Sequence, residues 1–313
     1  MRPSAHDDPC PPFPSPKDLN EVLHKALPDF GSVQWVNSTG STNADLIQRL
    51  KALHANTTHA ALDAHAPPQS PARPWLLGAH LQTAGKGRAG RPWANTAGST
   101  LMFSCAFEPN IPLARLPAIA PALGVATCLA LRSLLGAQYD HTRLEPLTLK
   151  WPNDLLWHGA KLAGVLIETG PNAQVVVGMG LNLKDAAALS LALERDIADL
   201  GMIQTQLQRE QPPETAVSAA QIVAHIALAW QRALKDYAKQ GYAAFRDPFD
   251  TIDALAGQPV QVIDQGHILH LGIAQGTDEH GRLRVVTDAG LIPVLVGDVS
   301  IRPANSFQAK GTP

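Results

Sequence analysis

The distribution of apolar and polar positions predicts strands and helices that alternate along the first part of the chain. An apolar strand at 33–38 is followed by a polar turn and by apolar residues at helical spacing over 44–50. Two more strands, at 74–84 and 99–107, flank a glycine-rich loop at 85–93. This order is typical of a sheet in which a long loop connects two strands.

The middle of the chain adds a buried helix and further strands. Apolar residues occupy most positions of 116–135, which predicts a helix with little exposed surface. The elements expected after it are a strand at 147–157 that turns at Pro152 and Asn153, a hairpin of two apolar strands at 162–169 and 173–183, and helices over 217–244. Together these elements predict an α+β fold, in which a mixed sheet packs against helices.

Three segments differ from this pattern in composition. The first 17 residues contain six prolines and predict a disordered tail, which we extend to residue 31 because the first strand begins after it. Pro, His and Ala dominate 54–74, which predicts a loop or a frayed helix end. From residue 257 short strands alternate with turns, which is typical of a small β-barrel of SH3-like size. We therefore expect a main domain over 32–250 and a C-terminal domain over 251–313.

Composition narrows the class of protein. The chain has 313 residues, with 25 basic and 27 acidic side chains, so a global charge excess that favours nucleic acid or membrane surfaces is absent. Three cysteines at irregular spacing indicate buried free thiols in a reducing compartment. No apolar run is long enough for a signal peptide or a membrane span. We expect a soluble, cytoplasmic protein.

The loop at 85–93 combines three glycines with the cations Lys86, Arg88 and Arg91. Glycine lets the backbone approach a ligand closely, and the cations neutralise carboxylate or phosphate charge. The spacing matches the GxGxxG of dinucleotide sites, but Gly90 leads into another strand and not into a helix, which disfavours that interpretation. A Walker A motif is excluded, because glycine follows Lys86. A solvated basic loop is the alternative that this segment leaves open.

Lys150 ends a strand that is otherwise apolar and begins the run Lys-Trp-Pro-Asn-Asp. A lysine that enters a core is costly unless it meets a negative partner, so a ligand carboxylate or phosphate would explain its position. The alternative is an edge-strand lysine that extends to solvent, followed by an ordinary turn. Asp154 either orients Lys150 or helps to position a reacting group, or is only a turn residue; both interpretations stay open.

A third polar group lies at a strand end, where Gly178 and Gly180 precede Asn182. The glycines would let a flat purine approach the backbone, whose edge an Asn could bind, although a bulge and turn explain the same residues. HExxH, zinc-like Cys/His spacing and GxSxG are absent from the sequence. We therefore predict no metal site made by protein side chains, and catalysis by charge and positioning around an anionic ligand.

Jointly and in this order, the segments resemble the biotin–protein ligase family. The family's Gly-Arg-Gly-Arg-x-Gly-Arg-x-Trp loop is similar to 85–93, Lys-Trp-Pro-Asn-Asp-Leu stands unchanged at 150–155, Lys-Leu-Ala-Gly follows at 161–164, Ser-Thr-Asn matches 41–43 and Gly-x-Gly-x-Asn matches 178–182. The resemblance covers about 32–303. It implies a class II synthetase-like biotin/lipoate ligase fold with an SH3-like C-terminal domain.

The resemblance also implies a two-step reaction. Biotin and ATP, with Mg²⁺, give biotinyl-adenylate, and a lysine of a biotin carboxyl carrier protein then takes the biotinyl group. The implied catalytic residues are Lys150 and Arg88; these two bind biotin with Ser41, Thr42, Asn43, Gln82, Gly85, Lys86 and Gly87, and the adenylate is bound by Arg88, Arg91, Trp93, Lys161 and Asn182. The loop is expected to order over the intermediate and to shield it from water.

Two departures from the family pattern matter. Lys86 stands where arginine is usual, which keeps the charge and loses bidentate geometry. Some members also carry an N-terminal winged helix-turn-helix and repress transcription. The proline-rich start of this chain cannot form that module, so we expect no DNA partner, and no membrane partner either. The sequence leaves the oligomeric state open, with a homodimer as one candidate. A lipoate–protein ligase or octanoyltransferase, and a non-catalytic biotin sensor, are the rival functions.

Overall fold

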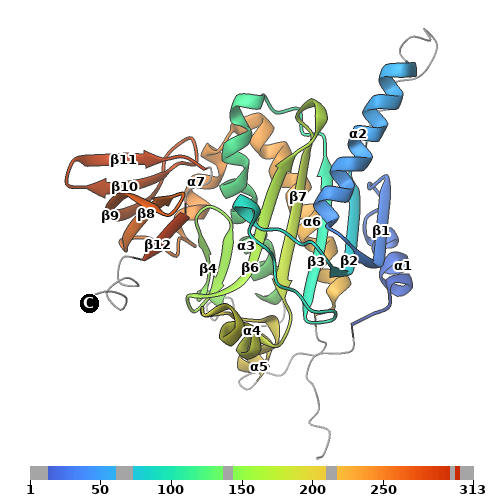
Figure 1. Ribbon diagram of the computed structural model, residues 1–313, viewed down its shortest axis with the longest axis horizontal. Helices are drawn as coiled ribbons and strands as arrows, with labels where there is room; N and C mark the ends of the chain where they lie inside the picture. Colours follow the sequence, from blue (N-terminus) through green and yellow to red (C-terminus); the bar gives the residue numbers. More distant parts are fainter. Residues whose placement is uncertain (1–12, 61–72, 137–143, 209–216, 297–299, 304–313) are drawn as a thin grey trace, which may run out of the picture.

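A computed structural model describes residues 13–60, 73–136, 144–208, 217–296 and 300–303. Its main feature is a seven-stranded sheet with the strand order β1-β2-β3-β7-β6-β5-β4 (Figure 1). β1 pairs with β2 in parallel, and every other neighbouring pair is antiparallel. The predicted mixed sheet is thus confirmed. The strands are β1 (Ser32–Thr39), β2 (Trp75–Gln82), β3 (Thr100–Phe107), β4 (Leu147–Lys150), β5 (Asp154–Trp157), β6 (Ala160–Thr169) and β7 (Val175–Asn182).

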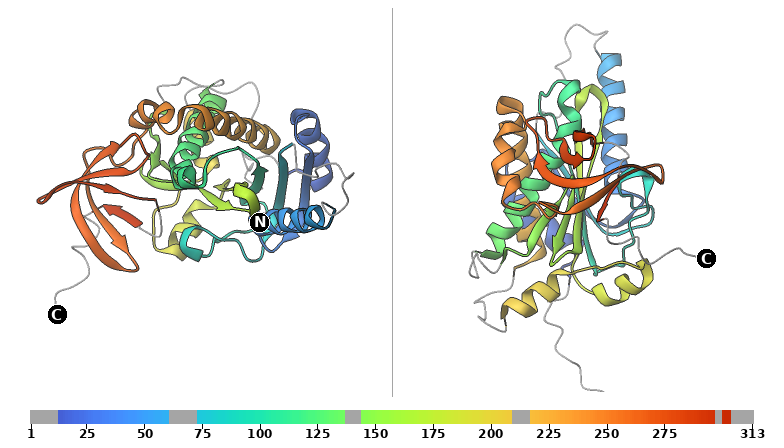
Figure 2. Two further views of the ribbon diagram at one scale, coloured as in Figure 1. Left: turned by 90° about the horizontal axis from the view of Figure 1, so that it is seen from above. Right: turned by 90° about the vertical axis from the view of Figure 1, so that its left-hand side faces the viewer.

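Helices cover both faces of this sheet, with α3 and α6 on one face and α2 on the other (Figure 2). Side chains of β3 alternate between the two layers. Phe103 stacks on Trp230 of α6 with ring centroids 5.2 Å apart, whereas Ala106 packs with Leu46 and Leu50 of α2. The face that carries α2 is also the face of the polar residues described below. These helices are α2 (Thr42–Ala60), α3 (Ile119–Gly136) and α6 (Ala219–Gln240).

The buried helix expected over 116–135 is α3. Together with the turn before it, the segment Leu113–Gly136 is long and apolar enough to cross a membrane by length and composition alone. However, 67% of its most apolar window is buried inside the protein. This burial is the property of a core helix, packed here between α6 and the sheet. Cys105 and Cys128 are free and buried, as predicted.

The N-terminal segment contains a helix, α1 (Pro16–Ala26), so the prediction of disorder up to residue 31 is wrong for this part. Leu19 and Leu23 lie one turn apart on α1 and are 1% and 0% exposed in the core that includes β1. Their burial offsets the entropy that ordering the segment costs. The proline content obscured this short apolar spacing. Residues 1–12 lie outside the described residues.

The chain from residue 257 forms a second sheet, with the order β11-β10-β9-β8-β12 and antiparallel pairing throughout. The expected short strands are confirmed. The described pairings make an open sheet in which the two edge strands are not paired with each other, so a closed barrel is not confirmed. The strands are β8 (Pro259–Asp264), β9 (His267–Thr277), β10 (Leu283–Thr287), β11 (Gly290–Val294) and β12 (Ser300–Pro303).

Three further α-helices of the described part of the chain lie between β7 and β8. The first two had no prediction, because the first has apolar residues on almost all sides and the second is only nine residues long, and the third lies almost wholly beyond the helices expected over 217–244. Helix α2 continues as far as Ala60, into the segment predicted as a loop or helix end, and 61–72 lies outside the described residues. The helices are α4 (Ala186–Leu193), α5 (Leu200–Gln208) and α7 (Ala243–Asp250).

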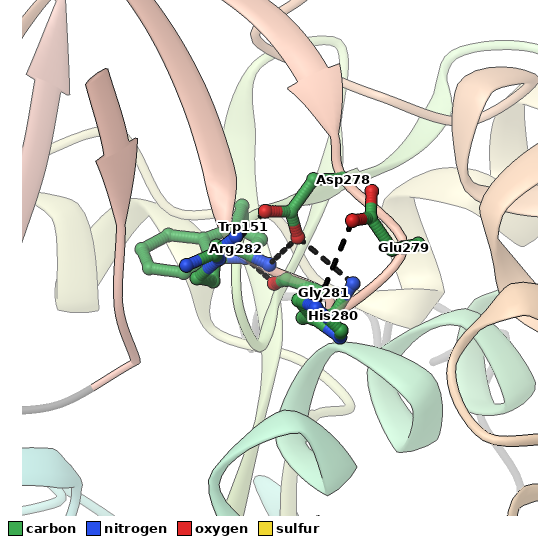
Figure 3. A network of polar contacts seen from close by, with 6 residues as sticks. All are labelled: Trp151, Asp278, Glu279, His280, Gly281 and Arg282. Carbon is green, nitrogen blue, oxygen red and sulfur yellow. Dashed lines mark hydrogen bonds and ion pairs between the residues drawn. The ribbon is translucent and has the colours of Figure 1, made fainter.

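The tip of the β9–β10 hairpin joins the two sheets (Figure 3). The Trp151 indole N–H donates a hydrogen bond of 3.0 Å to the carbonyl of Gly281. Asp278 fixes this turn, because its carboxylate accepts from the backbone N–H groups of His280 and Arg282 and from the Arg282 Nε, at 2.9, 3.0 and 2.6 Å. A rigid turn of the C-terminal sheet therefore supports the residue that follows Lys150.

Candidate active site

A cavity opens on the face of the main sheet that carries α2, between the 85–93 loop and strands β6 and β7. Its volume of about 160 Å³ corresponds to roughly five water molecules at liquid density, so a small organic group can enter it. Among the predicted site residues, Gly85, Lys150 and Asn182 do not line this cavity. Those that do are Ser41, Thr42, Asn43, Gln82, Lys86, Gly87, Arg88, Arg91, Trp93 and Lys161.

The floor of the cavity is built where α2 begins. Ser41, Thr42 and Asn43 are only 8%, 3% and 4% exposed, although all three are polar. The backbone N–H of Thr42 donates to the Gln82 Oε1 at 2.8 Å, which ties the start of α2 to the end of β2. Because buried polar groups are costly unless they are bonded, this floor is held in a fixed arrangement.

Two polar residues bonded to the floor lie outside the predicted site: Ser104 of β3, which also lines the cavity, and Glu168 of β6, which does not. The Ser104 hydroxyl donates to the Asn43 Oδ1 at 2.6 Å, and the Asn43 Nδ2 donates to the Glu168 Oε2 at 2.8 Å. Neither residue belongs to a motif. The available signal was weaker, because each is a polar position in a strand that is otherwise mostly apolar.

The 85–93 loop folds back on itself as a narrow hairpin. The Gly87 N–H donates to the Arg91 carbonyl at 2.7 Å, and the Trp93 N–H donates to the Gly85 carbonyl at 2.9 Å. One guanidinium nitrogen of Arg88 donates to the Asn153 Oδ1 at 3.3 Å. The loop therefore presents its cations to the cavity, which favours the anion-binding interpretation over a solvated basic loop.

Trp93 covers the ends of β6 and β7. An added Cβ at Gly180 would lie 2.4 Å from the indole of Trp93, and one at Gly178 would lie 2.3 Å from the Asn43 Oδ1. In this structure Asn43 and Trp93 lie against the two glycines, which both line the cavity, so the approach of a purine to them stays a prediction. The Lys161 Nζ lies over the Trp93 indole, 5.4 Å from the ring centroid.

Asp154 forms an ion pair with Lys161, with 2.7 Å between Oδ1 and Nζ. Both side chains line the cavity and are largely shielded from solvent. Asp154 is consequently more than a turn residue. It orients the lysine that faces Trp93, and it lies directly across the β4–β5 pair from Lys150.

Lys150 is the last residue of β4 and is partly buried. Burial lowers the pKa of Lys150 because the charged form loses solvation; Asp154 raises it in part, and the cations Lys161, Arg302 and Arg195 lower it further. An anion brought to this cluster of cations would relieve their repulsion. Arg302, on β12, brings the C-terminal sheet into the electrostatics of the site and was not predicted.

Asn182 and Arg195 lie together in a small recess beside the cavity, next to Trp93 and Lys161. The Asn182 Nδ2 donates to the carbonyls of Lys161 and Ala198 at 3.3 and 3.1 Å, so this amide holds the chain after α4 against β6. Arg195 lines both the recess and the main cavity. No motif marked Arg195, which lies in the segment without a predicted element.

Comparisons with known proteins agree with this architecture. A family model described as "Biotin/lipoate A/B protein ligase family" matches residues 53–182, and one described as "Biotin protein ligase C terminal domain" matches residues 256–302. Among solved structures, a biotin protein ligase from Aquifex aeolicus in complex with biotin and ATP superposes with a TM-score of 0.63 at 20% identity, over 88% of this chain and 100% of that one. This likeness shows the fold.

Curated relatives carry the family further. A biotin–[acetyl-CoA-carboxylase] ligase of Mycobacterium tuberculosis is 30% identical over 90% of this chain and 94% of its own length. A ligase of the same name from Paracoccus denitrificans is 32% identical over 69% and 85%, and the bifunctional ligase/repressor BirA of Escherichia coli is 28% identical over 88% and 76%. The chain belongs to the biotin–protein ligase family.

Proposed function

We propose that this protein is an ATP-dependent biotin–protein ligase that transfers biotin to a lysine of a biotin carboxyl carrier domain, as the names of its relatives indicate for theirs. One observation carries the proposal: a single cavity joins a buried floor of Ser, Thr, Asn and Gln to a hairpin with three cations. The floor suits a neutral ring with polar edges, and the cations suit a carboxylate and phosphates.

In the first step a carboxylate oxygen of biotin attacks the α-phosphorus of ATP, and the bond to the β-phosphate oxygen breaks to release pyrophosphate. In the second step an acceptor amine attacks the acyl carbon, AMP leaves, and the amine loses a proton. Both reactants of the first step are negative. Lys86 and Arg88, on the hairpin, and Lys150, at the end of β4, offset their repulsion.

The neighbouring residues have distinct tasks. Ser41, Thr42, Asn43 and Gln82 hold the biotin ring at the floor of the cavity. Arg91, Trp93 and Lys161, with Asn182 and Arg195 in the adjoining recess, lie on the adenylate side. The Trp93 indole N–H is buried without a hydrogen-bond partner among the described residues, so a ligand acceptor would satisfy it.

Mg²⁺ would enter with ATP. Among the described residues, no group of three His, Cys, Asp or Glu side chains could hold a metal ion. Mg²⁺ usually keeps several waters and takes one or two carboxylates together with substrate phosphates, so Asp154 at the cavity wall fits such a role. When bound, the ion would neutralise charge on the phosphate oxygens.

Several finer expectations stay predictions: an SH3-like form of the C-terminal sheet, a homodimer, the lack of DNA and membrane partners, and a cytoplasmic location. Sedimentation with and without biotin tests the dimer. A gel-shift assay at physiological salt tests the lack of DNA binding.

The deciding experiment supplies labelled biotin, ATP and Mg²⁺ with a carrier domain, and compares wild type with Lys150→Ala. Labelling by wild type and loss of most labelling in the variant support the function and the role of Lys150. Parallel reactions with lipoate and octanoate address the rival ligases. Labelling by one of these acids in place of biotin, or binding of biotin without consumption of ATP, would reject the proposal.

A further inference from the structure

A chain of hydrogen bonds runs from Glu168 to the ligand-facing floor of the cavity. The Glu168 Oε2 accepts from the Asn43 Nδ2 at 2.8 Å, and the Asn43 Oδ1 accepts from the Ser104 hydroxyl at 2.6 Å. The Ser104 and Thr42 hydroxyl oxygens are also 2.6 Å apart. Finally, the Thr42 N–H donates to the Gln82 Oε1 at 2.8 Å. This relay links a carboxylate on β6 to Thr42 and Gln82, which line the cavity together with Asn43 and Ser104.

The direction of every bond in the relay follows from its first member. A carboxylate only accepts, and the Leu166 carbonyl, 3.5 Å from the Asn43 Nδ2, accepts as well, so Asn43 turns its NH₂ group toward Glu168 and its oxygen toward Ser104. Ser104 has a single hydroxyl hydrogen, which it gives to Asn43. The hydrogen in the short contact between Ser104 and Thr42 must therefore come from Thr42. The Thr42 oxygen is left with lone pairs, and not a hydrogen, for a ligand.

The packing keeps Asn43 in this orientation. Thr42, Asn43 and Ser104 are at most 4% exposed, so water does not compete for their bonds. Gly178 of β7 lies against the amide, where an added Cβ would be 2.3 Å from the Asn43 Oδ1 and 3.1 Å from the Ser104 Oγ. The relay is thus enclosed on the side of β7. Thr42 also contacts the Gln82 Oε1 through its hydroxyl at 3.3 Å, a longer contact than the 2.6 Å to Ser104.

We propose that Glu168 is a positioning residue that sets ligand specificity, because it makes the Thr42 hydroxyl a hydrogen-bond acceptor. Such a floor selects a ring that offers an N–H, as a cyclic urea does, and disfavours a ring with oxygen at that position or a dithiolane without donors. This inference rests on the proposed function and adds to it: Glu168 does not line the main cavity, and it acts through Asn43 and Ser104.

The test compares wild type with Glu168→Gln, whose side-chain amide can donate to a flipped Asn43. Each hydrogen bond of the relay can then reverse its donor and acceptor. The substrates are biotin and its two carbamate analogues, in each of which one ring N–H is replaced by oxygen. Desthiobiotin, which keeps the urea and lacks the sulfur, is the substrate control. The readout is the ratio of kcat/KM for biotin to that for each analogue. Glu21→Gln, an exposed glutamate on α1, is the matched variant.

For wild type we expect a ratio of about 5 to 150 for one carbamate, which corresponds to one buried group left unpaired. In Glu168→Gln this ratio should fall below about 3, because Thr42 can then turn its hydrogen to the ring oxygen. The ratio for desthiobiotin should stay constant, since its urea still meets Thr42. Glu21→Gln should match wild type throughout.

An equal loss of activity toward all substrates in Glu168→Gln, with the ratios unchanged, would show a purely structural role and overturn the inference. If Glu168→Gln does not fold, Ser104→Ala breaks the same relay. The kcat/KM ratios expected for Glu168→Gln then apply to Ser104→Ala. Wild type that adenylates neither biotin nor any analogue would instead overturn the proposed function. These two failures are therefore distinguishable.

Discussion

At the scale of single residues, the site contains charged groups whose burial destabilises the ligand-free protein. Lys150 is partly buried, and three further cations lower its pKa together with the loss of solvation. The protein tolerates this because Asp154 compensates in part and because an anionic ligand would complete the compensation. Such local destabilisation is expected at a functional site, because groups arranged for catalysis are not arranged for maximal stability.

The lowered pKa of Lys150 gives a prediction for pH. The charged form is the one that offsets phosphate charge, and it is lost as pH rises through the pKa. Adenylation by wild type should therefore decline at a pH below 10.5, the ordinary value for lysine. In Lys150→Arg the decline should disappear, because arginine stays charged, while the rate at neutral pH falls through altered geometry. Pyrophosphate release measured across pH 7 to about 10 would check this, and the same alkaline limb in both proteins would assign it to another group.

Removal of the charge at the same position should change stability in the opposite direction from activity. Lys150→Met keeps the length of the side chain without a buried charge, so we expect a higher midpoint of urea unfolding together with a loss of adenylation of at least tenfold. Unfolding followed by circular dichroism, beside the labelling assay, measures both. A variant that loses stability and activity together would show that neighbouring groups already stabilise the charge of Lys150 before a ligand binds.

Arg88 is expected to govern retention of the intermediate. It lies on the hairpin, and its guanidinium donates a hydrogen bond to Asn153, another residue that lines the cavity. Arg88→Gly should release biotinyl-adenylate about 10- to 150-fold faster, because a charged hydrogen-bond donor to the phosphate is lost. Arg88→Lys, which keeps the charge, should fall between that variant and wild type. Equal retention by all three proteins in a filter-release assay would remove Arg88 from this role.

At the scale of elements, α1 shows that a proline-rich segment can contribute residues to the hydrophobic core. Leu23 is fully buried, while its neighbour Val22 is 50% exposed on the same helix. Leu23→Ala should lower the free energy of unfolding by about 2 to 5 kcal/mol through lost burial and the cavity left behind, and Val22→Ala by less than about 0.5 kcal/mol. Urea titrations would compare them. Equal and small effects would mean that α1 does not belong to the cooperative core.

The predictability of the elements follows from their physics. Strands such as β3 and β7 are continuous apolar runs, which sequence patterns identify well, and the Lys150 and 85–93 segments carry motifs with dense charge and glycine. Ser104, Glu168 and Arg195 were missed because their importance comes from neighbours far apart in the sequence. Similarly, the glycines at 178 and 180 line the cavity, but a sequence cannot show that Asn43 and Trp93 lie against them.

At the scale of the whole molecule, the turn at Gly281 supports Trp151 and, through it, the end of β4. Gly281 has φ of +74°, and an added Cβ would lie 3.0 to 3.2 Å from Tyr242 and Pro121. Gly281→Ala should therefore shift the turn, weaken the bond to the Trp151 indole, and reduce adenylation severalfold or more.

A matched control separates this effect from backbone strain. Gly266, in the β8–β9 turn, has a similar φ of +86° with open space around it. Gly266→Ala should cost about the same free energy of unfolding, about 1 to 3 kcal/mol, without change in adenylation measured well below the unfolding temperature. If both variants lose adenylation alike, the loss follows from strain, and the contact with Trp151 has no particular role.

The bond between Trp151 and Gly281 also bears on how this enzyme family can diverge. The donor is an indole, but the acceptor is a backbone carbonyl, which almost any residue supplies. The C-terminal sheet can therefore accumulate substitutions on its hairpin without losing the contact, provided that the turn keeps its shape. Covariation between aligned positions would consequently overlook it. Chimaeras that exchange the C-terminal sheet should succeed or fail according to the geometry of this turn, which Asp278 and Gly281 set.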